Sequence, residues 1–264
     1  MPKILLTNEE TEQLSNYRFS NKSKPTDSTI ELVELLKDEQ SLLNYMEELS
    51  KVIGSPNLKV TASIFVKRYA FLAVIYLYSM TKWNKSLDIS IDRISLQTKE
   101  DDEHWLPSFY FKKAEVEAMM GERNEWRDRC LQNLFSNHLS IVLSALSLHT
   151  KQSKLIMWEN IAIYIFWLYE SVFTQVDDDE LKNRASEDFH YIMNEAPGCL
   201  FGKYHNNPLK RHFHQKSYVE HLQEEVRVRT SCCFSYMLEG SSDKCKICPQ
   251  TCNIPKRGGV TIGG

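Results

Sequence analysis

The sequence lacks the motifs of several common protein classes. None of its nine glycines forms a Gly-rich phosphate loop or a G-x-G-x-x-G turn, so we expect no nicotinamide or flavin site. No apolar run reaches the roughly 20 residues of a membrane span, and the first ten residues do not resemble a signal peptide. No nucleophile stands in a recognisable constellation with His and Asp. There is no internal repeat, and 264 residues allow one large domain or two small ones.

The net charge is small, but it is unevenly distributed. A net charge of −3 by itself implies no nucleic-acid partner. Residues 203–264 carry ten basic and five acidic side chains, whereas residues 1–202 carry 22 basic and 30 acidic ones. A basic C-terminal part on an acidic body predicts a local electrostatic role. With no secretion signal expected, we predict a soluble cytoplasmic protein with at most peripheral membrane contact. In that reducing compartment clustered cysteines bind metals more often than they form disulfides.

Hydrophobic periodicity predicts an α+β protein that is predominantly α-helical. Helices are expected over residues 28–53, 58–80, 122–149, 156–176, 178–196 and from 217 to about 228. Apolar and polar residues alternate within residues 87–112, which predicts a small antiparallel β piece with a bulge where the alternation slips. We divide the chain into an N-terminal helical segment (1–57), a helical core (58–228), a cysteine segment (229–252) and a flexible tail (253–264).

Five of the seven cysteines lie within the 24 residues 229–252. Cys232 and Cys233 are adjacent, and eleven residues later Cys245 and Cys248 form a C-x2-C pair followed by Pro249. A C-x2-C turn directs two thiolates at one metal. Successive side chains of an extended segment point in opposite directions, so two adjacent cysteines serve one site only if the backbone bends or if they reach different metal atoms. This favours a binuclear [2Fe–2S] cluster, which takes four thiolates, over zinc, which usually takes two C-x2-C turns.

Other interpretations of the cysteines remain open at this point. A structural zinc site is one, and a [4Fe–4S] run through Cys245, Cys248 and Cys252 is a second. A disulfide or thiol-exchange site between Cys232 and Cys233 is a third. Cys252 is a fifth candidate ligand, although a solvent-facing bystander is the commoner case.

The run Arg229-Thr230-Ser231-Cys232-Cys233, followed by Tyr236, Leu238, Cys245, Cys248 and Pro249, resembles the C-terminal signature of the FhuF-like ferric siderophore reductase family. The segments 62–70, 137–139 and 155–160 are also similar to that family, so the resemblance covers about residues 58–250. The sequence departs from the family pattern in having eleven rather than ten residues in the gap, and in having Cys252.

The resemblance implies a [2Fe–2S] cluster on Cys232, Cys233, Cys245 and Cys248. It further implies a reductase that converts Fe(III) in an imported siderophore to Fe(II), which the chelator holds poorly. Since no flavin motif is present, a ferredoxin or flavodoxin-type protein is expected to supply the electrons. The alternatives are a non-enzymatic, zinc-stapled siderophore-binding protein and a relative of the siderophore synthetases, which would lack their large ATP-binding portion.

Basic side chains are the candidate substrate-binding residues. They are Lys203, Lys210 and Arg211 in a loop before the cysteines, and Lys67 and Arg68 in an otherwise apolar helix. Anionic iron chelates would be attracted to such groups, whereas the alternative is a solvated loop and side chains that snorkel from the edge of the core. Arg229 is expected either to donate to a cluster sulfur or to pair with Glu225 on a helix surface.

Overall fold

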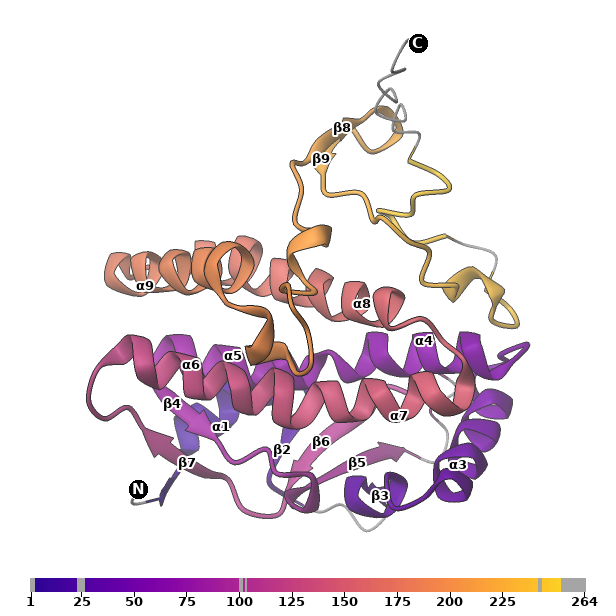
Figure 1. Ribbon diagram of the computed structural model, residues 1–264, viewed down its shortest axis with the longest axis horizontal. Helices are drawn as coiled ribbons and strands as arrows, with labels where there is room; N and C mark the ends of the chain where they lie inside the picture. Colours follow the sequence, from indigo (N-terminus) through magenta and orange to yellow (C-terminus); the bar gives the residue numbers. More distant parts are fainter. Residues whose placement is uncertain (1–2, 23–26, 100–101, 103, 242–243, 253–264) are drawn as a thin grey trace.

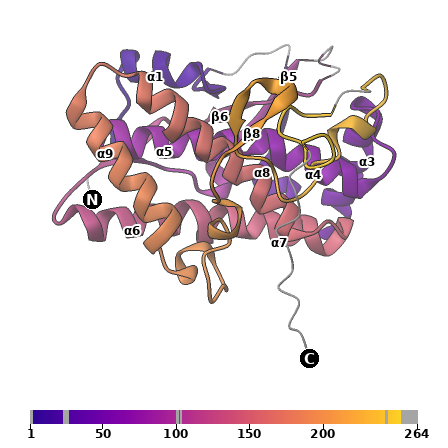
Figure 2. The same cartoon turned by 90° about the horizontal axis from the view of Figure 1, so that it is seen from above.

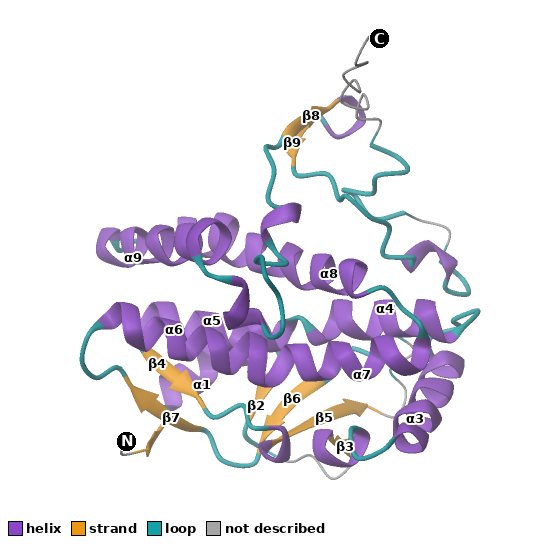
Figure 3. Ribbon diagram, in the orientation of Figure 1, coloured by secondary structure: helices purple, strands orange, loops and turns teal. Residues whose placement is uncertain are grey.

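The computed structural model describes residues 3–22, 27–99, 102, 104–241 and 244–252. The protein is a mostly helical α+β structure, as predicted (Figure 3). The helices are α1 (Asn8–Ser15), α2 (Leu32–Leu35), α3 (Glu39–Val52), α4 (Leu58–Tyr69), α5 (Phe71–Trp83), α6 (Arg123–Leu134), α7 (Ser140–Thr150), α8 (Lys154–Trp167) and α9 (Asp179–His190). The predicted flexible tail, residues 253–264, lies outside the described residues.

Figure 1 shows the elements in layers. Small sheets lie below, α4 to α7 form the middle, and α8 and α9 lie above. The cysteine segment lies on the upper side, over α8 and α4 in both views (Figure 2). Three helices continue into π-helical turns at Phe135–Leu139, Leu168–Val172 and Tyr191–Glu195.

Helices α4 and α5 form the centre of the core. They are apolar on nearly all sides, and Phe65, Tyr69 and Tyr76 are fully buried. Such a helix needs partners all round, which α3, α7, α8 and α9 supply. Among the described residues, Leu58–Trp83 is the one helical stretch long and apolar enough to cross a membrane. However, 83% of its most apolar window is buried inside the protein, as in a core helix.

The sheets are small and largely antiparallel. The strands are β1 (Lys3–Leu5), β2 (Phe19–Ser20), β3 (Asp27–Glu31), β4 (Lys85–Leu87), β5 (Ile94–Lys99), β6 (Ser108–Phe111), β7 (Glu115–Ala118), β8 (Ser217–Val219) and β9 (Glu224–Val226). One sheet has the order β1-β7-β4 and another the order β2-β6-β5-β3. The predicted antiparallel piece is confirmed by the β5–β6 pair. The expected bulge is instead a 3-10 turn at Ile91–Arg93.

The prediction of one helix over residues 28–53 is wrong at its start. Residues Asp27–Glu31 form β3 and pair with β5, with Thr29 opposite Gln97. The long helix α3 begins after Asp38, whose carboxylate accepts from the Ser41 amide at 2.8 Å and caps it. Ser28 therefore lies in strand β3, opposite Thr98 of β5, and does not cap a helix.

The helix predicted after Ser217 is also wrong. Residues 217–226 form the hairpin β8–β9, joined by a 3-10 turn at Glu220–Leu222 and by Gln223 at φ 55°. Val219, Val226 and Val228 lie in a second, small core with Cys252. β-branched residues favour such strands, and spacing that fits one helix face equally fits the inner side of this hairpin.

Candidate metal centre

Two of the four predicted ligand cysteines, Cys233 and Cys245, are in direct contact. The Sγ atoms of Cys233 and Cys245 lie 3.9 Å apart. Two thiolates bound about 2.3 Å from one tetrahedral ion would lie roughly 3.8 Å apart, so this pair has the spacing of two ligands on one metal atom. Cys233 and Cys248 are buried, whereas Cys232 and Cys245 are partly exposed.

Cys232 lies near the thiols of both Cys233 and Cys248. Burial raises the pKa of Cys232, these two thiols raise it further, and the Phe234 amide opposes them. Among the described residues, no three His, Cys, Asp or Glu side chains are grouped so that they could hold one ion. Four cysteine thiolates are the ligand number both of a [2Fe–2S] cluster and of a structural zinc site.

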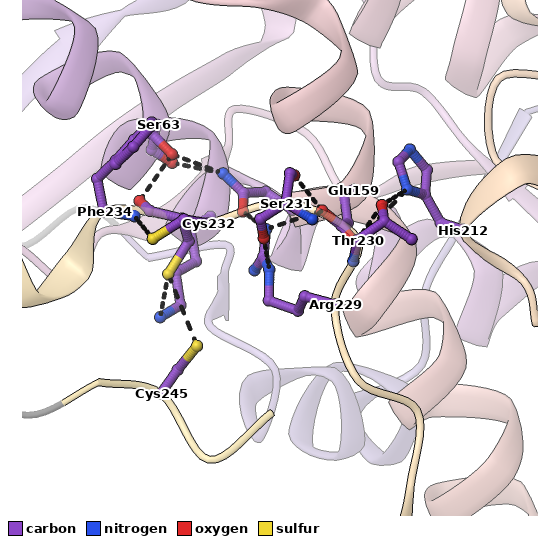
Figure 4. A network of polar contacts seen from close by, with 12 residues as sticks. Ser63, Glu159, His212, Arg229, Thr230, Ser231, Cys232, Phe234 and Cys245 are labelled. Carbon is purple, nitrogen blue, oxygen red and sulfur yellow. Dashed lines mark hydrogen bonds and ion pairs between the residues drawn. The ribbon is translucent and has the colours of Figure 1, made fainter. Parts of the chain in front are cut away.

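The backbone bends directly after the adjacent cysteines. Phe234 has φ 64°, in the left-handed region that non-glycine residues rarely adopt. Its amide N–H donates to Cys232 Sγ at 3.3 Å (Figure 4). The bend that the sequence requires for two adjacent cysteines is therefore present, and it also supplies a hydrogen bond to one sulfur.

Cys233 is prepared to be a thiolate. The contact with the Cys245 thiol lowers the pKa of Cys233 against the effect of burial, and the charges of Lys67 and Arg229 lower it further. Lys67 Nζ lies 3.9 Å from the Cys233 sulfur. The contact between the two thiols also raises the pKa of Cys245.

A buried carboxylate anchors the residues before the cysteines. Glu159 of α8, only 2% exposed, accepts from the backbone N–H and the hydroxyl of both Thr230 and Ser231 (Figure 4). The Thr230 hydroxyl also lies 2.9 Å from His212 Nδ1. Burial opposes ionisation, but the hydrogen bonds of His212 and Ser231 and the charge of Arg229 together lower the pKa of Glu159 to about 2. The carboxylate is therefore ionised at neutral pH, and it acts as a socket for this segment.

A second set of contacts continues from the socket to the cysteines. Arg229 is buried, and its guanidinium donates to Asn160 Oδ1 at 2.5 Å. Asn160 Nδ2 donates in turn to the Ser63 hydroxyl, which donates to the Cys233 carbonyl at 2.9 Å. The Arg229 amide also donates to the Ile247 carbonyl between Cys245 and Cys248. Arg229 thus joins both halves of the cysteine segment, and the predicted pair with the exposed Glu225 is wrong because no helix exists there.

The candidate substrate residues divide into two places. Lys67 contacts Cys233, and its neighbour Arg68 is partly buried, where burial and then Arg18 lower its pKa to about 10. Lys203, Lys210 and Arg211 are exposed in the loop after α9. Of these, Arg211 lines a cleft, whereas Lys210 donates to the Asn194 carbonyl outside it.

Cys252 is not solvent-facing, contrary to the commoner case expected from the sequence. It is 1% exposed, packs in the small core with the three valines, and its thiol lies 3.3 Å from the Lys246 carbonyl. This contact braces the C-x2-C turn from behind. Cys130 is buried in α6, and Cys199 is exposed.

Sequence reasoning did not assign roles to Ser63, Glu159 or Asn160. Glu159 lies 71 residues before Thr230, and nothing local indicates that its carboxylate serves the cysteine segment. One signal was present: Glu159 and Asn160 are polar side chains within the strongly apolar α8. Buried polar groups require hydrogen-bond partners, so these two side chains indicate a polar contact between α8 and another segment.

Comparison with protein families supplies a match for most of the chain. The family model described as ferric iron reductase FhuF-like transporter matches residues 63–220. The match includes Ser63, Lys67 and Glu159, and it ends before the cysteine segment. None of the curated proteins matches the sequence. On this match over more than half of its length, the chain belongs to the FhuF-like ferric iron reductase family.

Proposed function

We propose that this protein is a cytoplasmic ferric siderophore reductase that delivers one electron to Fe(III) and so releases Fe(II). Family membership supports an oxidoreductase acting on iron. The observation that carries the finer proposal is the 3.9 Å contact between the sulfurs of Cys233 and Cys245, with Cys232 bent into place beside Cys233 by Phe234. This donor set fits a [2Fe–2S] cluster, which supplies reversible one-electron transfer when bound.

The surrounding residues hold the cysteines and set their electrostatics. Lys67 and Arg229 place two positive charges near Cys233, which stabilises negative charge on the sulfurs and thereby favours the reduced state. The Phe234 amide adds a hydrogen bond at Cys232. The partial exposure of Cys232 and Cys245 leaves the centre close to the surface, where electrons can enter and leave over short distances.

The electron balance requires a second protein. One electron leaves a reduced donor of the ferredoxin or flavodoxin type, and one electron reduces Fe(III) in the chelate to Fe(II). The chelator holds Fe(II) poorly, so the metal is released without breaking a covalent bond of the siderophore. The protein returns to its starting state after each transfer, and its own residues position the chelate and the donor.

A zinc-stapled, non-enzymatic siderophore-binding protein is the alternative. Four thiols would suit zinc chemically. However, structural zinc sites usually take two C-x2-C turns, whereas two of these cysteines are adjacent in sequence, and the family match is to iron reductases. Both observations favour the reductase.

Anaerobic purification tests the proposal. We expect a red-brown protein with two irons and two sulfides per chain, the composition of a [2Fe–2S] cluster, and anaerobic Fe(II) release from ferric siderophores when a reductant is supplied. Single Ser variants of Cys232, Cys233, Cys245 and Cys248 should lose the iron and the activity. Cys252→Ser and Cys199→Ser should retain both. A colourless zinc protein, or loss of iron in Cys252→Ser with retention in Cys232→Ser, contradicts the assignment.

A further inference from the structure

A cleft opens on another side of α8 from the cysteine segment. It has a volume of about 480 Å³, which is within the range of ligand sites in proteins. It is lined by Lys154, Leu155, Trp158, Tyr204, His205, Asn206, Asn207, Pro208 and Arg211. The lining contains two basic side chains and a histidine, and no Asp or Glu. The charge of the cleft is therefore suited to an anion.

The two basic residues are not neutralised by the protein. Neither Lys154 nor Arg211 forms an ion pair within the described part of the chain. Lys154 donates to the Ser144 hydroxyl at 2.8 Å, which holds it at the rim, and Arg211 is exposed. A neighbouring hollow shares Lys154 and adds Lys151, again with no acidic lining residue. A concave surface of one sign concentrates ligands of the opposite charge.

One side of the cleft is aromatic. Trp158 donates its ring N–H to the Tyr204 hydroxyl at 2.9 Å, and the two rings meet edge to face at 81°. The loop that carries Tyr204 is held close by Gly198, where a Cβ atom would come within 2.5 Å of the Tyr204 carbonyl. Trp158 is 1% exposed and packs behind Tyr204, so the half-buried Tyr204 ring is the aromatic surface next to the basic groups.

Two pairs of consecutive residues connect the cleft to the cysteine segment. Trp158 and Arg211 line the cleft, and the residue after each, Glu159 and His212, contacts Thr230 in the cysteine segment (Figure 4). Consecutive helical residues lie about 100° apart around the axis, so α8 presents Trp158 to one site and Glu159 to the other. A ligand in the cleft would thus bind next to the socket of the metal centre.

We propose that this cleft binds the iron chelate, and that the preferred chelate is an aromatic, negatively charged one of the catecholate class. Arg211 and Lys154 meet the anionic oxygens, and Tyr204, held in place by Trp158, contacts a catechol ring. This deepens the proposed function and rests on it for the identity of the ligand. It also separates Arg211 from Lys210, which is adjacent in sequence, has the same charge and lies outside the cleft.

The test uses the gallium(III) complex of a tris-catecholate, which has the charge and shape of the ferric complex but is not reduced. Binding to the intact, iron-loaded protein is measured by calorimetry. We expect Arg211→Glu and Lys154→Glu each to raise the Kd by roughly tenfold or more, because each places a carboxylate against the anion. Lys210→Glu makes the same charge change beside the cleft and should alter the Kd by less than about twofold. The uncharged gallium trihydroxamate should bind weakly and with no dependence on Arg211.

The outcomes separate the cleft from the reductase. Equal losses of affinity in Arg211→Glu and Lys210→Glu would mean that only the general surface charge matters, and this would overturn the cleft as the binding site. So would loss of binding in Lys67→Glu and Arg68→Glu with wild-type binding in Arg211→Glu. Wild-type KM for ferric catecholate reduction by Arg211→Glu also overturns the cleft while leaving the reductase intact. Arg211-dependent gallium binding in a protein without reductase activity supports the cleft and contradicts the proposed function.

Discussion

The helical body and the cysteine segment are stabilised in different ways. In the body, Phe65, Tyr69 and Tyr76 of α4 and α5 are fully buried. The burial of apolar surface therefore stabilises these two helices. In the cysteine segment, residues 229–252, Phe234 and Leu238 are partly buried against the core of the body, and Cys252 lies in a small second core with Val219, Val226 and Val228. The polar contacts of the segment converge on Glu159 and Asn160. The body therefore has the means to fold by itself, whereas the segment depends on its socket and, under the proposed function, on its metal.

Phe65→Ala should have the largest effect, and on the body. The Phe65 ring is fully buried and stacks against Tyr69 at 5.4 Å and Trp105 at 5.2 Å. Its removal should lower the free energy of unfolding by about 3–5 kcal/mol, measured by urea denaturation followed by circular dichroism. At low temperature the iron content should stay at the wild-type level. Loss of iron before any loss of helical signal would contradict the separation of body and segment.

Glu159→Gln should affect the segment in preference to the body. The amide leaves donors of Thr230 and Ser231 without a carboxylate partner, which costs about 1–3 kcal/mol. We expect faster loss of iron to a chelator, with little change in helical unfolding. Glu180→Gln is the control, because this side chain is 88% exposed and forms only a surface pair with Arg184. Equal iron loss in both variants would exclude the socket.

The same carboxylate has a defined pH dependence. The pKa of Glu159 is about 2 in the folded protein and 4.5 ordinarily, so its contribution is fully present above pH 4.5 and is lost as the pH falls through 2. The stability difference between wild type and Glu159→Gln should therefore be constant from pH 7 to 5 and shrink towards pH 3. A difference that grows on acidification would show that the carboxyl is not ionised in the folded state.

Gly54→Ala should have the smallest effect, at the edge of the segment. Gly54 has φ +59°, a Cβ atom there would lie 2.5 Å from Glu239 Cβ, and its carbonyl accepts from the Glu239 amide. Backbone strain should cost about 1–2 kcal/mol, and the clash should also displace Glu239. Gly240→Ala is matched, because φ is +71° and nothing lies within 4 Å. Hydrogen exchange at the Glu239 amide should accelerate more in Gly54→Ala, and equal acceleration would leave strain as the sole cause.

Local patterns predicted much of the fold. The 3–4 spacing of apolar residues located α4 to α9, because each helix buries a face or its whole surface in one core. Patterns failed where a residue's partner is distant. Local pattern predicts a helix at strand β3, because its partner β5 lies about 70 residues later in the sequence. It also predicts a helix at the hairpin β8–β9, because three apolar positions do not distinguish a helical period of about 3.6 residues from a strand period of two.

The candidate site divides in the same way. Cysteine spacing indicated the ligands and the need for a backbone bend, which Phe234 provides. The socket could not be predicted, because Glu159 and Asn160 are brought to Arg229 and Thr230 only by the packing of α8 under the segment. Of the cleft, the sequence indicated only Arg211, by its charge, because Lys154 and Tyr204 are brought beside it by the packing of α8 against the loop after α9.

The small core around Cys252 bears on whether the C-terminal unit can be moved from one protein to another. Residues 217–252 carry their own hairpin and their own apolar centre, and they meet the body through polar and apolar contacts. The polar groups of the body are the Gly54 carbonyl, Ser63, Lys67, Glu159, Asn160, Glu170 and His212, and Phe234 and Leu238 pack on the main core. A chimera that moves this unit onto another member of the family needs those groups in place. Under the proposed function, the redox unit of one reductase could thus be exchanged for that of another, while the helical scaffold and its cleft stay unchanged.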